Sequence, residues 1–299
     1  MRVEQIISSK SQGTSSFFHS FFLPHQIDLR SDRFNFAEAI KIGLPKKEIV
    51  PKYGWVKDTP DKRDHRYAPS LEVMTNLPPS ADLRPYFPRV YNQENLNSCT
   101  ANAIAAAIEF DERKQKVRTP FVPSRLFIYY NERAMEGDVD SDNGAQIRSG
   151  IKSVSKLGSC REDIWPYLER RLKIKPPSHC YRQAVKYKVL EYQRLGHNLL
   201  HLKSCLASGF PFVFGIKVYS SFEGARVRKT GHLEMPEAHE KLVGKHAVIA
   251  AGYQDSRKWF IVRNSWGERW GIKGYFTIPY KYLLDRRLSA DFWTIRVIR

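Results

Sequence analysis

The sequence predicts an α+β protein, in which helices come first and strands follow. Residues 99–110 form an alanine-rich run typical of a helix, and apolar residues recur at three- and four-residue spacing over 143–158. After about residue 181, short β-branched and aromatic runs are separated by Gly, Asp and Asn, as in strands joined by turns. Helices followed by strands favour α+β over alternating βαβ units. A site shared by the two parts would lie in the cleft between them.

The individual elements follow from local signals. The first helix begins beside Cys99, where Thr100 and Asn102 suit a helix start, and a second is expected over 123–136. The segment 143–158 ends at a glycine, which is a typical helix stop. The expected strands are 210–219, 246–255, 258–266, 274–280 and 291–298.

The domain organisation follows a change in composition. The chain has 299 residues, enough for one large domain or two modest ones. Residues 1–76 are rich in Lys, Arg, Ser and Pro and are interpreted as an N-terminal extension, with a short helix over 33–44. Residues 77–299 form the main domain, with helices over about 77–180 and strands over about 181–299.

Composition leaves partners and location open. The formal net charge is +18, from 49 Lys+Arg against 31 Asp+Glu, which favours anionic partners but is more often typical of a generic basic surface. The sequence has no nucleic-acid-binding motif, and its apolar runs are too short to span a bilayer. The N-terminus has no continuous apolar region of a signal peptide, so cytoplasmic location and non-classical export both remain open. A monomer is the simplest expectation.

The cysteines and histidines predict neither a disulfide scaffold nor a metal site. If Cys99 is catalytic, three other cysteines remain and at most one bridge can form, with Cys160 and Cys180 as the favoured pair. His197 and His201 are four residues apart, as in some metal sites, but no third ligand is apparent. No metal and no cofactor are therefore expected.

Cys99 has two interpretations. A helix start lowers the pKa of a cysteine, because unpaired N–H groups and the positive end of the helix dipole favour the thiolate. A cysteine beside alanines is also commonly an inert packing residue. Helix placement alone therefore does not make Cys99 a nucleophile.

Three further residues supply what a nucleophilic cysteine needs. His246, at the start of an apolar strand, is a candidate base, and Asn264 could accept a hydrogen bond from its ring while Trp266 shields that bond from water. Gln93, six positions before Cys99, could place its amide beside the Cys99 backbone N–H as an oxyanion hole.

These elements, in this order, resemble the papain-like cysteine peptidases, the family that includes the cathepsins. The resemblance runs from Leu77 to the C-terminus through "LPPSADLR", the Gln-x5-Cys spacing, "HAVIAAGY" and "NSWGERWGIKGYF". It implies a two-lobed fold, with a helical lobe and an antiparallel, barrel-like β lobe that enclose the active-site cleft. It also implies Cys99 as nucleophile, His246 as general base and acid, Asn264 as orienter and Gln93 as oxyanion donor, with a thiolate–imidazolium pair at rest.

The chain departs from the family at the residues beside the nucleophile. The usual Cys-Gly-Ser-Cys-Trp is here Leu96-Asn97-Ser98-Cys99-Thr100, and Glu94 stands where the family has Gly. Lys245 precedes the histidine and would disfavour the imidazolium if its ammonium pointed inward. This pattern resembles a divergent, microbial-type branch, and it bears on efficiency more than on identity.

The resemblance also implies how substrates bind. Gly144 and Ala145 resemble the segment whose backbone pairs with substrate, and Ala247, Trp266 and residues near Trp293 would line the groove and its apolar S2 pocket. We expect an endopeptidase that acts on extended protein or peptide substrates with an apolar residue second from the cut. Residues 1–76 would be a propeptide-like, cleft-covering extension that makes the chain a zymogen, anchored by "FFHSFFLP" and "YGW". The alternative is a disordered tail followed by a strap packed on the body of the protein.

Two other function classes remain to be distinguished. The chain could be a pseudoenzyme whose papain-like body is a basic binding module, but the intact Cys99, His246, Asn264 and Gln93 argue against this. It could also be another acyl-transfer enzyme, such as a transglutaminase-like chain. Such enzymes typically use Asp as the third member, so Asn264 with Trp266 favours the peptidase.

Overall fold

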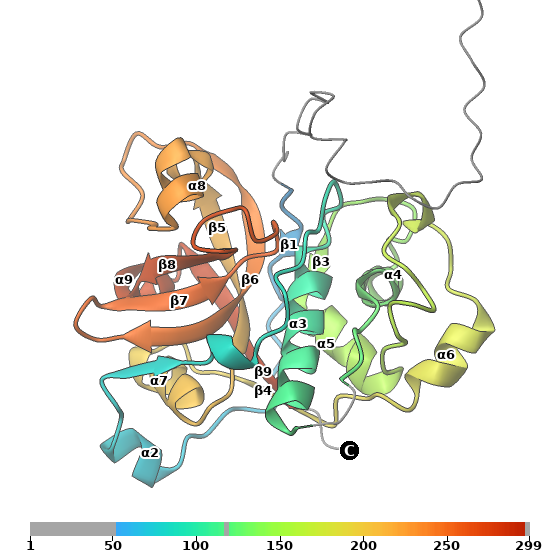
Figure 1. Cartoon of the computed structure of the whole chain (residues 1–299), viewed down its shortest axis with the longest axis horizontal. Coiled ribbons are helices and arrows are strands. Elements are labelled where there is room, and N and C mark those ends of the chain that lie inside the picture. The colour runs from blue at the N-terminus through green and yellow to red at the C-terminus, as the bar shows by residue number, and fades with distance from the viewer. Residues whose placement is uncertain (1–51, 117–119, 297–299) are drawn as a thin grey trace, which may run out of the picture. The chain divides into compact units, whose positions relative to one another are not determined.

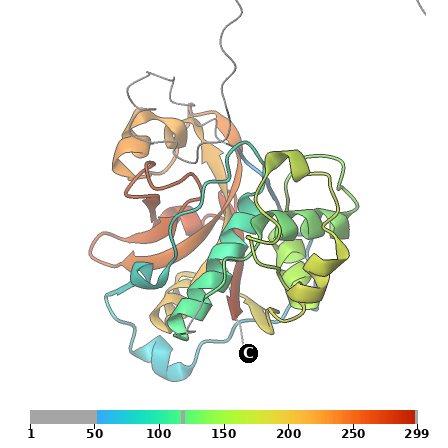
Figure 2. The same ribbon diagram turned by 45° about the vertical axis from the view of Figure 1, so that its right-hand side comes forward.

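Two lobes meet in the computed structural model, which describes residues 52–116 and 120–296 of the chain (Figure 1). Helices form one lobe and a largely antiparallel sheet forms the other, with α3 (Cys99–Lys114) lying between them (Figure 1 and Figure 2). The α+β prediction is therefore confirmed. The helix predicted over 33–44 and the anchor "FFHSFFLP" lie outside the described residues.

The helical lobe is built around α3, whose residues 99–112 are all buried. Its alanines have small side chains, so neighbouring elements on every side can approach the helix backbone closely. The next helix, α4, starts after Ser124, whose hydroxyl accepts a hydrogen bond from the N–H of Phe127, and it ends at Gly137 in the left-handed conformation. The helices of this lobe are α3, α4 (Arg125–Glu136), α5 (Ile147–Lys156), η2 (Glu169–Arg171) and α6 (Ser178–Ala184).

The second lobe is a sheet with the strand order β4-β9-β5-β6-β7-β8, and β2 pairs with the far end of β6. Every pairing in this sheet is antiparallel. Its strands are β2 (Ser80–Asp82), β4 (Glu191–Arg194), β5 (Phe212–Tyr219), β6 (Leu242–Gln254), β7 (Trp259–Arg263), β8 (Tyr275–Pro279) and β9 (Ser289–Arg296). The short helices α2 (Leu71–Thr75), η1 (Arg84–Tyr86), α7 (Leu199–Ala207), η3 (Ser220–Glu223), α8 (Ala225–Thr230) and α9 (Tyr280–Leu284) connect or flank these strands.

Strand β6 carries the polar side chains of the site into the core. Most of its residues before His246, Lys245 among them, are exposed, whereas the strand from His246 through Tyr253 is buried. The register pairs His246 with Ile216 and Ala247 with Gly215 on the neighbouring strand β5. The change from exposed to buried backbone therefore falls at the predicted base.

Residues 52–67 cross the junction of the two lobes, and we call them the strap. Near one end, β1 (Trp55–Val56) pairs in parallel with β3 (Ala145–Gln146), and Figure 1 shows the two strands beside the start of α3. At the other end, the N–H of Tyr67 donates to the carbonyl of Arg194. Although the strap lies within the predicted extension, it is packed into both lobes.

The cysteines are all free and buried, so the predicted Cys160–Cys180 bridge is absent. The two thiols do contact each other through a side-chain hydrogen bond. The sequence therefore identified neighbours but not a covalent bond.

The two histidines considered for a metal make other contacts. His197 Nε2 lies 2.6 Å from the carbonyl oxygen of Leu283, and the ring of His201 packs edge-on against Tyr67. Within residues 52–116 and 120–296, no group of three or more metal-ligating side chains comes together. In the same ranges, no helix is both long and apolar enough for a membrane span.

Candidate active site

Cys99 is the first residue of α3 and is completely buried. Its Sγ accepts two backbone hydrogen bonds at 3.3 Å, one from the N–H of Ala247 in β6 and one from the N–H of Gly54 in the strap. The sulfur thus lies where the helical lobe, the sheet and the strap meet. The helix N-terminus and both donors favour negative charge on the sulfur.

His246 in β6 and Asn264, directly after β7, form a hydrogen-bonded pair. His246 Nε2 lies 2.8 Å from Asn264 Oδ1, which also accepts the N–H of Ser265 at 2.8 Å. Because an amide oxygen only accepts, Nε2 carries the hydrogen and Nδ1 is left as the basic nitrogen. Nδ1 is buried and has no hydrogen-bond partner among the described residues. The ring of Trp266 stacks on His246 with 5.1 Å between centroids, as expected for a shield against water.

Gln93 is completely buried and held in one orientation. Its Oε1 accepts the hydroxyl of Ser265 at 2.6 Å, which directs the Nε2 group the other way. Nε2 donates to the carbonyl of Leu96 at 2.9 Å and to the carbonyl of Lys52 in the strap at 3.3 Å. A strap carbonyl therefore already lies against the amide that was predicted to bind the oxyanion.

The predicted substrate-binding residues also contact or adjoin the strap. The N–H of Ala145 donates to the carbonyl of Gly54 at 2.8 Å, and the N–H of Gly144 donates to the hydroxyl of Tyr129 at 3.2 Å. Ala247 is buried, and its N–H is occupied by the sulfur of Cys99. The edge at Ala145 is thus filled by backbone from the same chain.

Two aromatic residues of the strap fill the groove on either side of Gly54. The ring of Tyr53 lies edge-on to His246, at 5.8 Å between centroids, and its hydroxyl donates to Glu223 at 2.5 Å. Trp55 lies against the backbone of Gly215 so closely that an added Cβ would be 2.0 Å from the indole. The "YGW" motif predicted as an anchor is therefore placed in the groove.

Sequence reasoning missed the polar floor beneath Trp55. The indole Nε1 donates to Asp291 Oδ2 at 3.1 Å, and the same oxygen accepts the N–H of Asp58 at 2.8 Å. Arg194 donates to the other oxygen of Asp291 at 2.9 Å. Residues near Trp293 were expected to line an apolar pocket, but Asp291, two positions earlier, is a buried carboxylate.

Burial changes the ionisation that the family resemblance implied. Burial raises the pKa of Cys99 to about 12, although the N–H groups of Ala247 and Gly54 act in the opposite direction. Burial likewise lowers the pKa of His246 to about 4, partly offset by its hydrogen bond to Asn264. With the strap in place, the site favours a neutral thiol and a neutral imidazole instead of the expected ion pair. Lys245 is exposed, so its ammonium is not buried beside the ring.

The residues that depart from the family pattern make specific local contacts. Thr100, in place of the usual aromatic residue, donates its hydroxyl to the buried carboxyl of Glu132 at 2.5 Å. Burial raises the pKa of Glu132 well above its ordinary value. Glu94, in place of glycine, has a φ of 51°, in the left-handed region that glycine adopts most easily.

Comparisons with known proteins match most of the chain. A family model described as papain family cysteine protease matches residues 77–283. An uncharacterized peptidase C1-like protein of Acanthamoeba polyphaga mimivirus is 43% identical over 274 residues, covering 84% of this chain and 88% of that protein. Pro-cathepsin H of Bos taurus is 25% identical over 244 residues, covering 77% and 68%.

The solved structures agree with this assignment. Xylellain, a cysteine protease from Xylella fastidiosa, superposes with a TM-score of 0.79 at 45% identity, covering 83% of this chain and 96% of its own. The chain therefore belongs to the papain family of cysteine proteases.

Proposed function

We propose that the chain is a cysteine endopeptidase whose strap holds it latent until the strap leaves the groove. The observation that carries this proposal is the seating of Gly54, whose N–H contacts Cys99 Sγ and whose carbonyl accepts the N–H of Ala145. Backbone from another protein could use the same donors and acceptors once the strap has moved. The site is thus shaped for an extended peptide.

The hydrogen bonds define a route for the proton. Since Nε2 of His246 is committed to Asn264, Nδ1 takes the proton from Cys99 Sγ. The sulfur bonds to the peptide carbonyl carbon, and the electron pair of the C=O bond moves to oxygen. Nδ1–H then protonates the leaving amine as the C–N bond breaks, which gives a thioester. Water, deprotonated at Nδ1, bonds to the carbonyl carbon of the thioester. The C–S bond then breaks, the acid product leaves, and Nδ1–H returns its proton to the sulfur.

Gln93 stabilises the charge that develops on the carbonyl oxygen. Its Nε2 faces the carbonyl of Lys52 at 3.3 Å, so a backbone oxygen can reach this donor. One such donor is typically worth about 10²–10³ in rate. The backbone N–H of Cys99, at the start of its helix, is the second donor in this proposal.

The strap resists cleavage because it presents a backbone N–H to the sulfur of Cys99 and not a carbonyl carbon. Cys99 Sγ accepts an N–H hydrogen bond from Gly54, and a sulfur held by an N–H in this way is not aligned with a carbonyl carbon. The strap also runs parallel to β3. A segment in this orientation fills the groove without entering the reaction.

Substrate preference follows from the seat of Trp55. The space that Trp55 occupies is bounded on one side by Gly215, which leaves room for a large ring. Asp291 lies at its base and accepts the indole N–H. We therefore propose a preference for a large, largely apolar side chain with a hydrogen-bond donor, such as tryptophan, second from the cut. The wholly apolar pocket predicted from the resemblance is thus revised.

A thiol-reactive peptide epoxide tests the function directly. We expect an adduct at Cys99 that is absent in Cys99→Ala and much weaker in His246→Ala, together with hydrolysis of peptide substrates. Labelling should be slow in the full chain and faster in a chain that begins at Lys57, which lacks the groove-filling part of the strap. A chain beginning at Leu77 is a poorer choice, because it also removes Asp58 and Asp64, which bind buried partners in the body.

The outcomes separate the alternatives. An adduct without peptide hydrolysis in either chain would refute the peptidase mechanism and favour the pseudoenzyme. Equal labelling rates in the two chains would refute latency but leave the peptidase proposal standing.

A further inference from the structure

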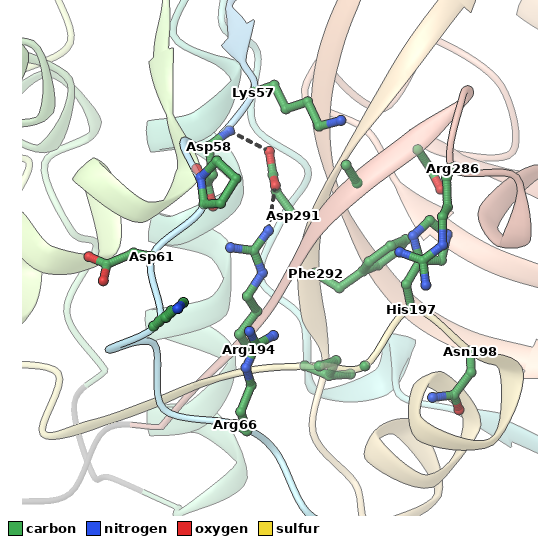
Figure 3. Close-up of a pocket in the computed structure, with 16 residues that line it drawn as sticks. Lys57, Asp58, Asp61, Arg66, Arg194, His197, Asn198, Arg286, Asp291 and Phe292 are labelled. Carbon is green, nitrogen blue, oxygen red and sulfur yellow. Dashed lines mark hydrogen bonds and ion pairs between the residues drawn. The ribbon is translucent and has the colours of Figure 1, made fainter.

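A second hollow lies away from Cys99, between the strap and the sheet lobe. Its volume is about 780 Å³. Figure 3 shows Lys57 entering it from the strap, with His197 and Arg286 on the side of the sheet lobe. Asp291 lies at its edge, so this hollow adjoins the seat of Trp55 without including the catalytic residues.

Four cations that line the hollow have no partner. They are Lys57, Lys62, Arg66 and Arg286, and none of these side chains forms an ion pair or hydrogen bond with the residues that the structure describes. All four are exposed to the solvent of the hollow. An unpartnered cluster of like charges is unfavourable unless a counter-charge binds there.

The carboxylates of the hollow do not balance these four cations, because two of the three are already paired with other cations. Asp61 pairs with Arg63 at 2.9 Å and with Lys152 at 3.7 Å. Asp291 pairs with Arg194 at 2.9 Å, whereas Asp58 accepts from the neutral indole of Trp293 at 2.8 Å and leaves one negative charge against the four cations. The positive charge of the hollow is therefore left unbalanced.

The charges of the hollow also act on His197. Burial lowers its pKa and its hydrogen bond to the carbonyl of Leu283 raises it. Among the neighbouring charges, Arg286 and Lys57 lower the pKa, whereas Asp285 raises it. Cations from the strap and from the sheet lobe thus act on the same point of the hollow wall.

We propose that this hollow binds a small, multiply charged oxyanion of the phosphate class, held by Lys57 and Arg286. Lysine and arginine are the side chains that bind phosphate groups most strongly, through charge-assisted hydrogen bonds. An anion with two linked phosphates offers acceptors to cations on several walls at once. This ligand also gives the net charge of +18 a specific partner.

The anion would hold the strap in place, and this part of the inference rests on the proposed function. Lys57 belongs to the strap, whereas Arg286 follows α9 in the sheet lobe. A ligand that bridges them binds the covered state better than the open one and therefore shifts the population towards the covered state.

Binding is tested with sodium pyrophosphate on the full chain carrying Cys99→Ala, so the result does not depend on peptidase activity. Inorganic phosphate and sulfate test whether linked phosphates are needed, and sodium chloride at equal ionic strength is the reference. Calorimetry should show saturable binding, and the thermal midpoint should rise by roughly 5–10 °C at a hundred times the Kd. Arg286→Ala and Lys57→Ala should each weaken binding by roughly tenfold or more.

Lys281→Ala is the matched control, since Lys281 is an exposed cation on α9 that does not line the hollow. It should leave the affinity unchanged. The proposal is overturned if pyrophosphate acts no differently from chloride, or if the Arg286→Ala and Lys57→Ala chains bind it as well as the parent chain does.

The effect on the strap is read from alkylation of Cys99 by iodoacetamide in the otherwise unaltered chain. Pyrophosphate at ten times its Kd should slow alkylation about tenfold, because opening would require release of the anion. The slowing should be lost in Arg286→Ala. Binding without slowing would overturn the coupling to the strap, whereas slowing with no peptidase activity would leave the anion site intact and refute the proposed function alone.

Discussion

Replacing Trp55 by alanine should uncover Cys99 in the intact chain. Trp55 is 5% exposed, its indole lies against Gly215, and its Nε1 donates to Asp291 at 3.1 Å. Truncating a buried tryptophan typically costs about 3–5 kcal/mol. Since Asp291 keeps its bonds from Asp58 and Arg194, we take the lower figure.

A loss of about 3 kcal/mol corresponds to a roughly 100-fold larger open fraction, because about 1.4 kcal/mol is a factor of ten. Cys99 is buried beneath Gly54 and reacts only when the strap opens. If opening and closing are faster than alkylation, the alkylation rate follows the open fraction and should rise by the same factor.

The assay is alkylation of the full chain with iodoacetamide, with the adduct located by mass spectrometry. Leu71→Ala is the control, because Leu71 lies in α2, outside the groove, and is 72% exposed. It should leave the rate unchanged. If Trp55→Ala lowers the thermal midpoint but leaves the alkylation rate unchanged, the strap opens only when the whole domain unfolds, and the reasoning fails.

Three further predictions concern stability. Burial, reinforced by a neighbouring carboxylate, raises the pKa of Asp291 to about 6, so the covered state favours its protonated form; this unfavourable contribution is present at pH 7 and should be relieved as the pH falls towards 5. The thermal midpoint of the parent chain should therefore rise over that range relative to that of Asp291→Asn. If the thermal midpoints of both chains change equally with pH, the pKa of Asp291 is not raised in this way. Asp64→Asn should cost about 3 kcal/mol in denaturant unfolding, because Asp64 pairs with the partly buried Arg148 and Arg194, and a loss below about 1 kcal/mol would show that the pairs are not needed. Glu94→Gly should change the free energy of unfolding by less than about 0.5 kcal/mol or stabilise the chain, since relief of the positive φ offsets the added chain entropy; a larger loss would show that the Glu94 side chain itself contributes.

The signals that single out the candidate catalytic residues are local in the sequence. The Gln-x5-Cys spacing places Gln93 and Cys99 on one turn and the following helix start, and Asn264 follows a strand that pairs directly with the strand of His246. Residues that are close together in the chain, or that lie on directly paired strands, stay close together in the folded protein. The two-lobed architecture was predictable for a similar reason, because the helical and strand-forming segments are separate along the chain.

The polar floor of the groove could not be predicted in the same way. Asp58 and Asp291 are 233 residues apart, and their contact depends on how the strap crosses the sheet lobe. Each is an ordinary acidic residue in the sequence. The pattern around Trp55 marked an anchor, but no periodicity reveals which distant carboxylate meets its indole.

The ionisation of the site was also beyond the sequence. The sequence motifs that resemble papain-like peptidases imply a reactive ion pair between Cys99 and His246. The pKa values of both side chains, however, depend on whether water reaches them. Here Gly54 and Tyr53 cover that space. The same residues can therefore favour a neutral pair in one arrangement of the chain and a charged pair in another.

The way Gly54 and Trp55 enter the groove has a consequence for inhibition by a separate peptide. A segment joined to its site by a short stretch of chain acts at an effective concentration of roughly millimolar, without any gain in contact energy. Here Asp58, only three residues after Trp55, is bound to the body through Asp291 and Trp293. A synthetic peptide with the sequence of residues 52–57 lacks this tether, so it would need about millimolar concentration to cover Cys99 as fully as the chain covers itself.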